Sequence, residues 1–568
     1  MTNPVRQGGL PPAPTLFLAL AVGASCRPGP HADLIIRNAA VYTMATPEKA
    51  EAIAVRAGKI MMVGTNAEVD RLANDSTEVF DLAGRMVLPA FHDTHLHPAG
   101  GLSLSECRFD DLTTAQAIVD SVARCASNAP NAAWIRGRGW PLPVFQGANP
   151  SKLLLDRVIP DRPVYLAAAD GHSAWVNSKA LELAAITRAT ADPPNGRIER
   201  DRSGEPTGTL RESAMELVGR LLPPYTMEQR KAGLRRALAL ANELGITTLH
   251  DASVSPEFLA AYSEMDRDGE LTERVIAAQY VDPDLPLTQV DSLIAWRDRF
   301  KGTRYFRPTA AKFFADGVIE AKTAALLAPY LNSGTDAGTP NFRQGQMDSL
   351  VAALDKAGIT IHIHAIGDLG IRMSLDALER ARAANGPRDA RPIIAHLELF
   401  DPADIPRFKA LGVIASFQPL WAFADPYITE LTEPILGPAR SRWLYPIGSL
   451  VKSGAVVAPG SDWTVSSMNP LEAIQVAITR RGPTDSAGPP WIPEEVVDLK
   501  TMLEAYTKNG AYAAGDEKVT GTLEVGKAAD LIVIDRDLFT IPPTKIHEAK
   551  VLLTLLDGNS VYRSKVLR

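Results

Sequence analysis

The stretch "MDSLVAALDKAGITIHIHAIGD", residues 347–368, contains the pattern that decides the fold. Its first half has apolar residues at helical spacing and ends at Gly358, and its second half is a short β-branched run. A helix that stops at a glycine and leads directly into such a strand is half of a β–α–β unit, which builds parallel sheets. The stretch therefore predicts a helix followed by a strand of a parallel sheet.

The same order of helix, glycine and strand occurs three more times, at Gly245, Gly412 and Gly454. Three further runs, "GRMVLPAFHD", "YFRPTAAKFFADG" and "RPIIAHLEL", have the composition of buried strands. This number of units predicts an α/β fold with a (β/α)8 TIM barrel over residues 89–516. The alternative is a doubly wound open sheet. The lack of a glycine-rich phosphate loop after the first strand weakens a nucleotide-binding interpretation.

β-rich runs at both ends of the chain predict a second, smaller domain. "DLIIRNAAVYTM" and "EAIAVRAGKIMMVG" lie near the amino terminus, and "ADLIVIDRDLF" and "KVLLTLLDGNSVYRS" lie near the carboxyl terminus. We expect residues 32–88 and 517–568 to form a small β-sandwich domain, with the barrel inserted between them. Residues from about 101 to 225 do not fit the repeat and predict an insertion after the first barrel strand.

Residues 1–31 resemble a secretory signal. Arg6 precedes an apolar run, Leu16–Ala24, which is followed by small residues and Cys26. This order predicts export, to a periplasm or as a membrane-anchored lipoprotein with lipid on Cys26. Gly23 stands where lipoprotein signals usually carry a large aliphatic residue. A leader without a targeting role, a mis-assigned start and a cytoplasmic protein are the alternatives.

Composition limits the class of protein and its partners. The chain has 568 residues, of which 46% are hydrophobic, so it can bury a normal core. Its net charge of −7 argues against a nucleic-acid partner, which would require a basic surface. Besides Cys26, the cysteines are Cys107 and Cys125. They predict either one disulfide in an exported protein or two buried thiols.

Most of the histidines lie in or just after predicted strands. Seven of the ten do so: His92, His95, His97, His250, His362, His364 and His396. The carboxyl ends of barrel strands meet at one mouth, and residues i and i+2 of a strand face the same way. Imidazole nitrogens are common zinc ligands. The pattern predicts a metal site at the mouth, to which Asp462, after the last repeat unit, would also contribute.

Other polar residues near these strand ends have two interpretations each. His92 has the opposite parity to His95 and is expected to be packed or to support a ligand. We expect His362 to fill the barrel. Asp316 would orient a ligand or cap a turn. His250 and Asp251 would hold imidazole tautomers or simply end a strand.

The predicted insertion is expected to shape a substrate pocket on the side of the barrel mouth. His172, in "DGHSAWVNS", is the candidate for a catalytic, substrate-contacting or oxyanion-stabilising group. The alternative is a histidine that caps a turn. Trp140 and Trp175 are compatible with a pocket for an apolar group, or with simple packing.

The motifs "PAFHDTHLHP", "AAKFFADG", "HIHAIGD", "IIAHLEL", "APGSDW" and "GTLEVGKAADLIVID" occur in an order that resembles the amidohydrolase superfamily. Within it, the chain is similar to the branch of N-substituted formamide deformylases and related metal-dependent hydrolases. The resemblance runs from about residue 33 to the carboxyl terminus and includes the insertion phrases "GHSAWVNSKAL" and "GEPTGTL". It departs from the family at Ala90 and His92, where a glycine and an aliphatic residue are usual.

The resemblance implies two divalent metal ions, zinc by default and Fe or Mn as alternatives. His95 and His97 match the ligands of the more buried ion. His364 and His396 match the ligands of the more exposed ion. Asp462 matches the aspartate that binds metal and shuttles protons.

Lys312 matches the lysine that CO2 converts to a carbamate, which bridges the two ions. The residues agree with this interpretation, because an ammonium group in the apolar stretch "AAKFF" would be costly to bury without a partner. If Lys312 is unmodified, a site for one metal ion remains, and deamination becomes the more plausible reaction.

The resemblance further implies an enzyme that hydrolyses an amide-type C–N bond of a small molecule, an N-formyl or N-acyl amine, by metal-activated hydroxide. The alternatives are a deaminase and a hydrolase of lactones or cyclic imides. A non-catalytic scaffold ranks last because every ligand position is filled. A homo-oligomer is compatible with the sequence.

Overall fold

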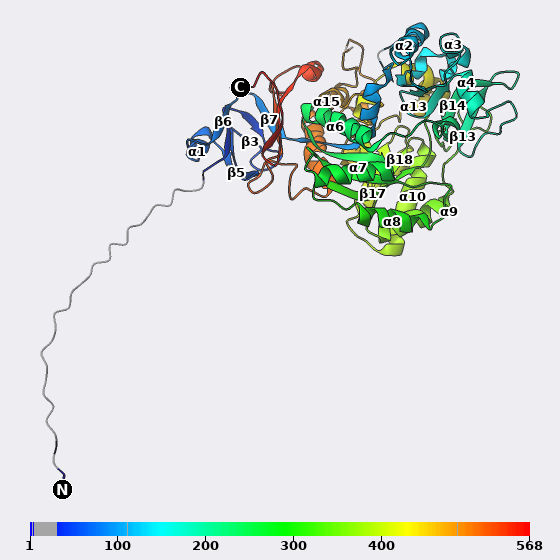
Figure 1. Ribbon diagram of the computed structural model, residues 1–568. Helices are drawn as coiled ribbons and strands as arrows, with labels where there is room; N and C mark the ends of the chain where they lie inside the picture. The colour runs from blue at the N-terminus through cyan, green and yellow to red at the C-terminus, as the bar shows by residue number, and fades with distance from the viewer. Residues whose placement is uncertain (3, 5–30, 111, 485–486, 568) are drawn as a thin grey trace.

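The computed structural model describes residues 1–2, 4, 31–110, 112–484 and 487–567 (Figure 1). The predicted leader, residues 1–31, lies almost wholly outside the described residues, and so does Cys26. Export and lipid attachment therefore stay predictions. Within the described ranges, no helix is long and apolar enough to cross a membrane.

Eight parallel strands form one sheet in which neighbours follow sequence order. They are β8 (Phe91–Leu96), β15 (Ile246–Val254), β16 (Arg274–Tyr280), β17 (Phe306–Phe314), β18 (Thr360–Ala365), β19 (Ile393–His396), β20 (Ile414–Phe417) and β21 (Val456–Val457). Backbone hydrogen bonds join the first strand to the segment after the last. Thr94 N–H donates to the Pro459 carbonyl at 3.1 Å, and Asp462 N–H donates to the His95 carbonyl at 2.7 Å. The sheet therefore closes on itself, and the predicted TIM barrel is confirmed.

The helix–glycine–strand units form as predicted. The helices are α6 (Met227–Glu243), α9 (Gln344–Lys356), α11 (Ile405–Leu411) and α14 (Ile447–Ser453). The glycines that follow them, at positions 245, 358, 412 and 454, have φ between +69° and +84°, where a side chain would be strained. Further helices that follow barrel strands are α7 (Pro256–Arg267), α8 (Gln289–Arg299), α10 (Asp368–Asn385), α15 (Pro470–Thr479), α16 (Leu499–Glu504) and α17 (Gly510–Ala514).

Strands from both chain ends form two further sheets. The smaller sheet has the order β5 (Lys59–Gly64), β4 (Ala52–Arg56), β1 (Leu34–Arg37), β6 (Glu78–Asp81). The larger has the order β24 (Asn559–Arg563), β23 (Val551–Leu556), β22 (Leu531–Ile534), β7 (Met86–Pro89), β2 (Ala40–Tyr42), β3 (Lys49–Ala50). β7 and β22 pair antiparallel, with Val87 opposite Val533, so the two ends of the chain share one sheet.

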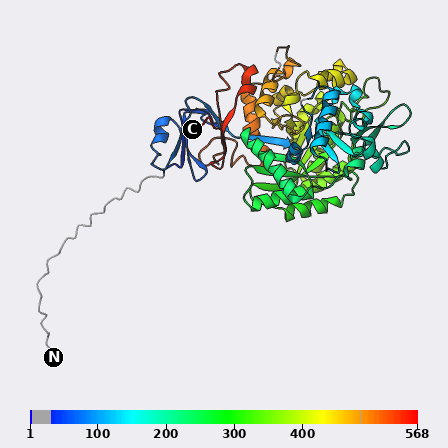
Figure 2. The same ribbon diagram turned by 45° about the horizontal axis from the view of Figure 1, so that its top comes forward.

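The segment between β8 and β15 has a sheet of its own. Its order is β13 (Gly196–Arg200), β14 (Pro206–Glu212), β12 (Ser173–Val176), β11 (Val164–Ala168), β10 (Ile135–Trp140), β9 (Cys107–Arg108). Its helices are α2 (Ala115–Asn128), α3 (Lys152–Asp156), α4 (Ser178–Leu183) and α5 (Glu216–Gly219). We call residues 101–225 the insertion. In Figures 1 and 2, the insertion and the sheets of the chain ends lie on opposite sides of the barrel.

Two expectations for the insertion can be compared with the structure. Cys107 and Cys125 form a disulfide, so the alternative of two thiols is wrong. Trp140 and Trp175 are fully buried on β10 and β12, with ring centroids 6.4 Å apart. They pack the core of the insertion and do not line a pocket, because their side chains fill the space between the sheet and its helices.

A buried ionic cluster joins the barrel to the sheet of the chain ends. Arg274, the first residue of β16, donates to Asp530 at 2.5 Å and to Asp557 at 2.8 Å. Arg274 and Asp530 are both fully buried. A buried pair of this kind is costly to break from one side, because the remaining charge stays in a low-dielectric environment.

We predict that Asp530→Ala lowers the free energy of unfolding by about 3–5 kcal/mol, because Arg274 keeps its charge and loses its main partner. Urea unfolding followed by tryptophan fluorescence measures the effect. Glu48→Ala is the control, since it removes only the exposed pair with Lys500 and should leave the unfolding midpoint almost unchanged. Equal effects of the two substitutions would contradict this role of the cluster.

Candidate metal centre

His95, His97 and Asp462 converge on one point at the barrel mouth. His95 Nε2 and His97 Nε2 lie 3.4 and 3.0 Å from Asp462 Oδ1. One nitrogen or oxygen atom from each residue lies within 4.8 Å of the others, a spacing that a single cation can bridge. Asp462 has φ of 52°, and the turn after β21 holds it in this strained conformation.

His364 and His396 lie beside this group. Their ring centroids are 4.4 Å apart, and the His396 ring is 4.6 Å from that of His95. Gln418 Oε1 accepts a hydrogen bond from His396 Nδ1 at 2.9 Å. The other nitrogen, His396 Nε2, is buried and has no hydrogen-bond partner among the described residues. Because no hydrogen-bond donor occupies the lone pair of this nitrogen, the nitrogen is free to coordinate a metal ion.

Lys312, on β17, completes the set of six predicted positions. Its Nζ lies 3.2 Å from His95 Nε2 and 4.7 Å from the centre of the Phe314 ring. The side chain is fully buried, and no described carboxylate forms an ion pair with it. Burial lowers the pKa of Lys312 to about 7. A large share of the amine is therefore neutral near pH 7, and the neutral amine is the form that reacts with CO2.

Burial also holds the imidazoles neutral. Desolvation lowers the pKa of His95, His364 and His396 well below the ordinary value. For Asp462, burial opposes ionisation, but the hydrogen bond from His97 and the attraction of nearby positive charge, that of Lys312 included, bring its pKa to about 2. The site thus offers neutral nitrogens and one carboxylate, the donor set that zinc prefers.

Two buried groups fix the orientation of His95. His362 Nε2 lies 2.8 Å from His95 Nδ1, so the expected barrel filler also holds a ligand ring. Asp93 accepts the backbone N–H groups of His95 and Ser461 at 3.0 and 3.1 Å. It ties β8 to the loop that carries Asp462. Asp93 was not predicted from the sequence, although an acidic residue inside the apolar strand "FHDTHL" is a visible signal.

Asp316 caps a turn. Its buried carboxylate accepts the backbone N–H groups of Ala325, Ile366 and Gly367 at 2.8–3.0 Å. These bonds hold the loops after β17 and β18 together at the start of α10, where a negative charge is favourable. Of the two expectations for Asp316, the turn cap agrees with the structure.

Asp251 and His92 lie outside the cluster of ligands. Asp251 accepts a hydrogen bond from the Tyr262 hydroxyl at 2.9 Å, so the expectation that it holds an imidazole tautomer is wrong. The hydroxyl of Tyr262, on α7, binds this carboxylate instead. His92 packs against Gly510, where a β-carbon would lie 2.3 Å from that of His92, and this agrees with the expected packing role.

His172 carries a charge at the mouth. Its Nδ1 lies 2.9 Å from Glu212 Oε2, and its ring lies 5.2 Å from that of His364. Burial alone would lower the pKa of His172, but the Glu212 carboxylate outweighs it and raises the pKa to about 9. The imidazolium has no lone pair for a metal and is instead suited to stabilise negative charge. Glu212, which has an unusual φ of 48°, was not predicted from the sequence.

The ligand cluster opens into a pocket of about 1140 Å³. The barrel contributes Lys312, His364, His396 and Asp462, and the insertion contributes residues that include His172. Apolar and aromatic side chains form other parts of the wall: Tyr165, Met215, Leu222, Pro223, Tyr280 and Phe314. The volume suits a small organic molecule.

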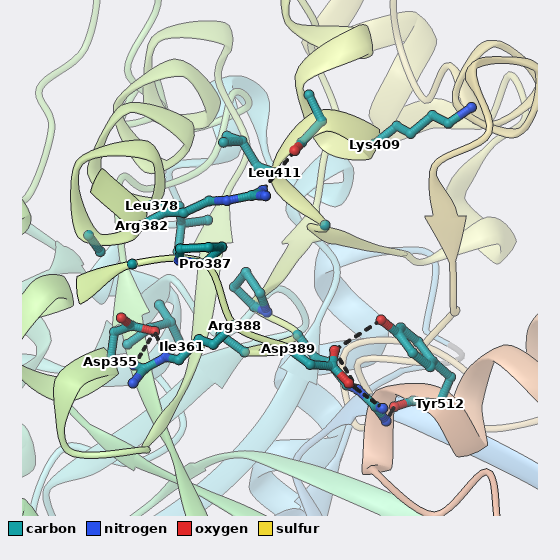
Figure 3. A pocket seen from close by; sticks show the side chains of 17 residues that line it. Asp355, Ile361, Leu378, Arg382, Pro387, Arg388, Asp389, Lys409, Leu411 and Tyr512 are labelled. Atoms are coloured by element: carbon teal, nitrogen blue, oxygen red, sulfur yellow. Dashed lines mark hydrogen bonds and ion pairs between the residues drawn. The ribbon is translucent and has the colours of Figure 1, made fainter. Parts of the chain in front are cut away.

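A second cavity, of about 520 Å³, lies elsewhere on the barrel, among α9, α10 and the loop before β19 (Figure 3). The arginines that line this cavity pair with carboxylates and a carbonyl group of the protein. Arg388 pairs with Asp355, Arg391 pairs with Asp389 and Glu517, and Arg382 donates to a backbone carbonyl. These contacts stabilise the fold, and none of the predicted site residues lies there.

Comparison with known proteins agrees with this geometry. The sequence pattern of the amidohydrolase family matches residues 78–562. The chain belongs to this family. It is an amidohydrolase, so the predictions of a metal-dependent enzyme and of a hydrolase acting on C–N bonds are confirmed.

Relatives cover nearly the whole amidohydrolase chain. The protein LONG AFTER FAR-RED 3 of Arabidopsis thaliana is 32% identical, over 94% of this chain and 92% of its own. The N-substituted formamide deformylase of Arthrobacter pascens is 29% identical, over 93% and 97%. The crystal structure of an uncharacterized metal-dependent hydrolase from Pyrococcus furiosus has a TM-score of 0.68 and 26% identity, covering 89% of this chain and 99% of that one.

We predict that Glu212→Gln lowers the pKa of His172 from about 9, because burial is then opposed only by the weaker attraction of Asp170 and Asp462. In the wild type, the raised pKa contributes stability below pH 6.5 that is lost as the pH rises through about 9. NMR titration of ¹³C-labelled histidines in chelator-treated protein measures the pKa, with His172→Asn for assignment. Glu199→Gln, which removes a carboxylate paired with Arg211 in the same sheet, should not move it. An unchanged midpoint in Glu212→Gln would contradict the assignment.

Proposed function

We propose that this amidohydrolase hydrolyses the amide-type C–N bond of an N-formyl or N-acyl amine at two divalent ions bridged by a carbamate on Lys312. One observation supports this above all others. Lys312 is buried, forms no ion pair with any described carboxylate, and lies 3.2 Å from His95 Nε2 inside a cluster of neutral imidazoles. As an ammonium group it would repel the cations that those imidazoles are suited to bind, whereas a carbamate supplies two oxygens and a negative charge.

The donor set fits the proposed ions. His95 and His97 would hold one ion, and His364 and His396 would hold the other, with Asp462 as a further ligand. The buried His396 Nε2 without a hydrogen-bond partner supports this arrangement. Zinc is the ion of first choice for such imidazole-rich sites, and Fe and Mn are the alternatives.

When bound, such ions lower the pKa of a water molecule to about 7 and polarise a substrate carbonyl. The protein supplies the proton path. Asp462 is ionised at neutral pH, so its carboxylate accepts a proton from the attacking water and passes it to the leaving nitrogen. The His172 imidazolium donates a hydrogen bond to the oxygen on which negative charge develops. The products are an amine and a carboxylate.

The similarity over nearly full length to a protein named N-substituted formamide deformylase supports amide hydrolysis over deamination or lactone opening. The Cys107–Cys125 disulfide supports a further proposal, that the enzyme works in an oxidising compartment after export.

We predict that the zinc-loaded enzyme releases equal amounts of amine and carboxylic acid from members of a panel of N-formyl and N-acyl amines. Asp462→Asn should lower kcat/KM about 100- to 10,000-fold, because it removes the proton carrier. Asp298→Asn is the control, since this exposed carboxylate pairs with Arg297 outside the pocket and its loss should leave kcat/KM nearly unchanged. Release of ammonia from a ring substrate, or of an acid without an amine, would favour the deaminase or the lactonase instead.

We predict about two metal equivalents per chain by elemental analysis, together with a protein-bound carbamate signal in ¹³C NMR after growth with labelled bicarbonate. Lys312→Ala should lose the signal and reduce the metal content, because the bridge is gone. Lys409→Ala, at the second cavity, should keep both. One equivalent that Lys312→Ala leaves unchanged would rule out the bridged pair.

A further inference from the structure

Arg138 is a cation in the wall of the catalytic pocket whose side chain forms no hydrogen bond or ion pair within the described part of the chain. It lies on β10 of the insertion and lines the same pocket as His364 and Asp462. Its Nε is buried without a hydrogen-bond partner. Among the residues that the structure describes, no carboxylate forms an ion pair with its guanidinium group.

The other arginines near this part of the insertion are all satisfied. Arg136, two residues earlier on the same strand, donates to the Pro223 carbonyl and stacks on Tyr225, with 5.0 Å between guanidinium and ring centre. Arg211, on β14, binds Glu199 at 3.1 Å, and Arg108, on β9, binds Asp110 at 2.7 Å. The lack of a partner is therefore particular to Arg138 and not a general property of the sheet.

An arginine in this position is costly unless something pairs with it. A guanidinium group stays charged at neutral pH even where burial lowers its pKa, as it does for Arg138. Its fork of N–H donors matches a carboxylate with two parallel hydrogen bonds. Since no described carboxylate forms this pair, an anion that enters the pocket from solution would complete it.

The position of Arg138 indicates which half of a substrate carries that anion. Arg138 and Asp462 line the same pocket, and among the described carboxylates Asp462 attracts the guanidinium group more strongly than Asp110 or Asp170 does, so the two groups act on the same part of the pocket. Under the function proposed above, Asp462 delivers a proton to the leaving nitrogen. The anion would therefore belong to the amine half, close to the bond that breaks.

We propose that Arg138 binds a carboxylate on the amine half of the substrate, which makes N-acyl amino acids the preferred substrate class. This inference rests on the proposed function for its orientation, but the binding of an anion by Arg138 can be measured without hydrolysis. Two carboxylates near Arg138 compete for this role. Asp110 attracts Arg138 but is already paired with Arg108. Asp170 also lines the pocket and has a buried Oδ2 without a partner, and Arg138 would bind it if the side chains shifted.

Two ketones that the enzyme cannot hydrolyse test the proposal with the metal-loaded protein. The first is N-acetylphenylalanine, as the racemate, with a methylene group in place of the amide N–H. The second is the same ketone without its carboxylate. Calorimetry should show that the wild type binds the acidic ketone about tenfold or more tightly than the neutral one. Arg138→Met should abolish this difference by weakening only the acid, and Arg138→Lys should keep part of it.

Arg188→Met is the control, because it removes the same charge from the insertion but from an exposed pair with Glu205 outside the pocket. It should keep the full preference. Metal content and the thermal midpoint of Arg138→Met, compared with the wild type, verify that the variant is folded and loaded. Equal binding of both ketones by the wild type would overturn the inference and indicate that Asp170 neutralises Arg138.

Hydrolysis of N-acetylphenylalanine and of N-acetylphenethylamine separates this inference from the proposed function. If both amides are cleaved and the two ketones bind equally, the function stands and the role of Arg138 is wrong. If neither amide is cleaved but Arg138 still selects the acidic ketone, the anion site stands and the proposed reaction is wrong.

Discussion

The closure of the barrel is the constraint on which the candidate site depends. β8 and β21 lie hundreds of residues apart in the chain, and their junction places Asp462 beside His95 and His97. Backbone hydrogen bonds at 2.7–3.1 Å cross this junction, and the buried Asp93 carboxylate reinforces it through Ser461. The approach is so close that a β-carbon on Gly460 would lie 2.5 Å from the His95 nitrogen. A larger residue there would separate the strands and move Asp462 away from His95 and His97.

Closure also controls the charge of the groups that it brings together. The barrel mouth excludes water from the imidazoles and from Lys312, and the loss of solvation favours their neutral forms. Neutral imidazole nitrogens can bind cations, so burial keeps these side chains in the form that coordinates a metal ion. His172 is the exception, because Glu212 supplies a carboxylate close enough to outweigh desolvation. A charged donor and neutral ligands therefore coexist in one pocket.

The parts of the fold that could be predicted from the sequence are those that depend on local rules. Four helices end at glycines with positive φ, and the period of two along strands identified the paired histidines. β16 was not predicted, because its strand "RVIAAQY" does not directly follow a glycine that ends a helix. Asp93 and Glu212 were missed for a different reason. Their partners, Ser461 and His172, lie far away in sequence or across a sheet, and only the folded chain reveals such contacts.

The barrel and the insertion supply side chains of different charge to the pocket. The barrel groups are mostly neutral nitrogens held in register by strand pairing, and this arrangement suits the binding of cations. The insertion contributes fixed cations, His172 with its carboxylate and Arg138 without one. Because the six-stranded sheet of the insertion has its own core and disulfide, it can present these side chains rigidly without contributing to the barrel. A different insertion on the same barrel would keep the chemistry and change which substrates reach it.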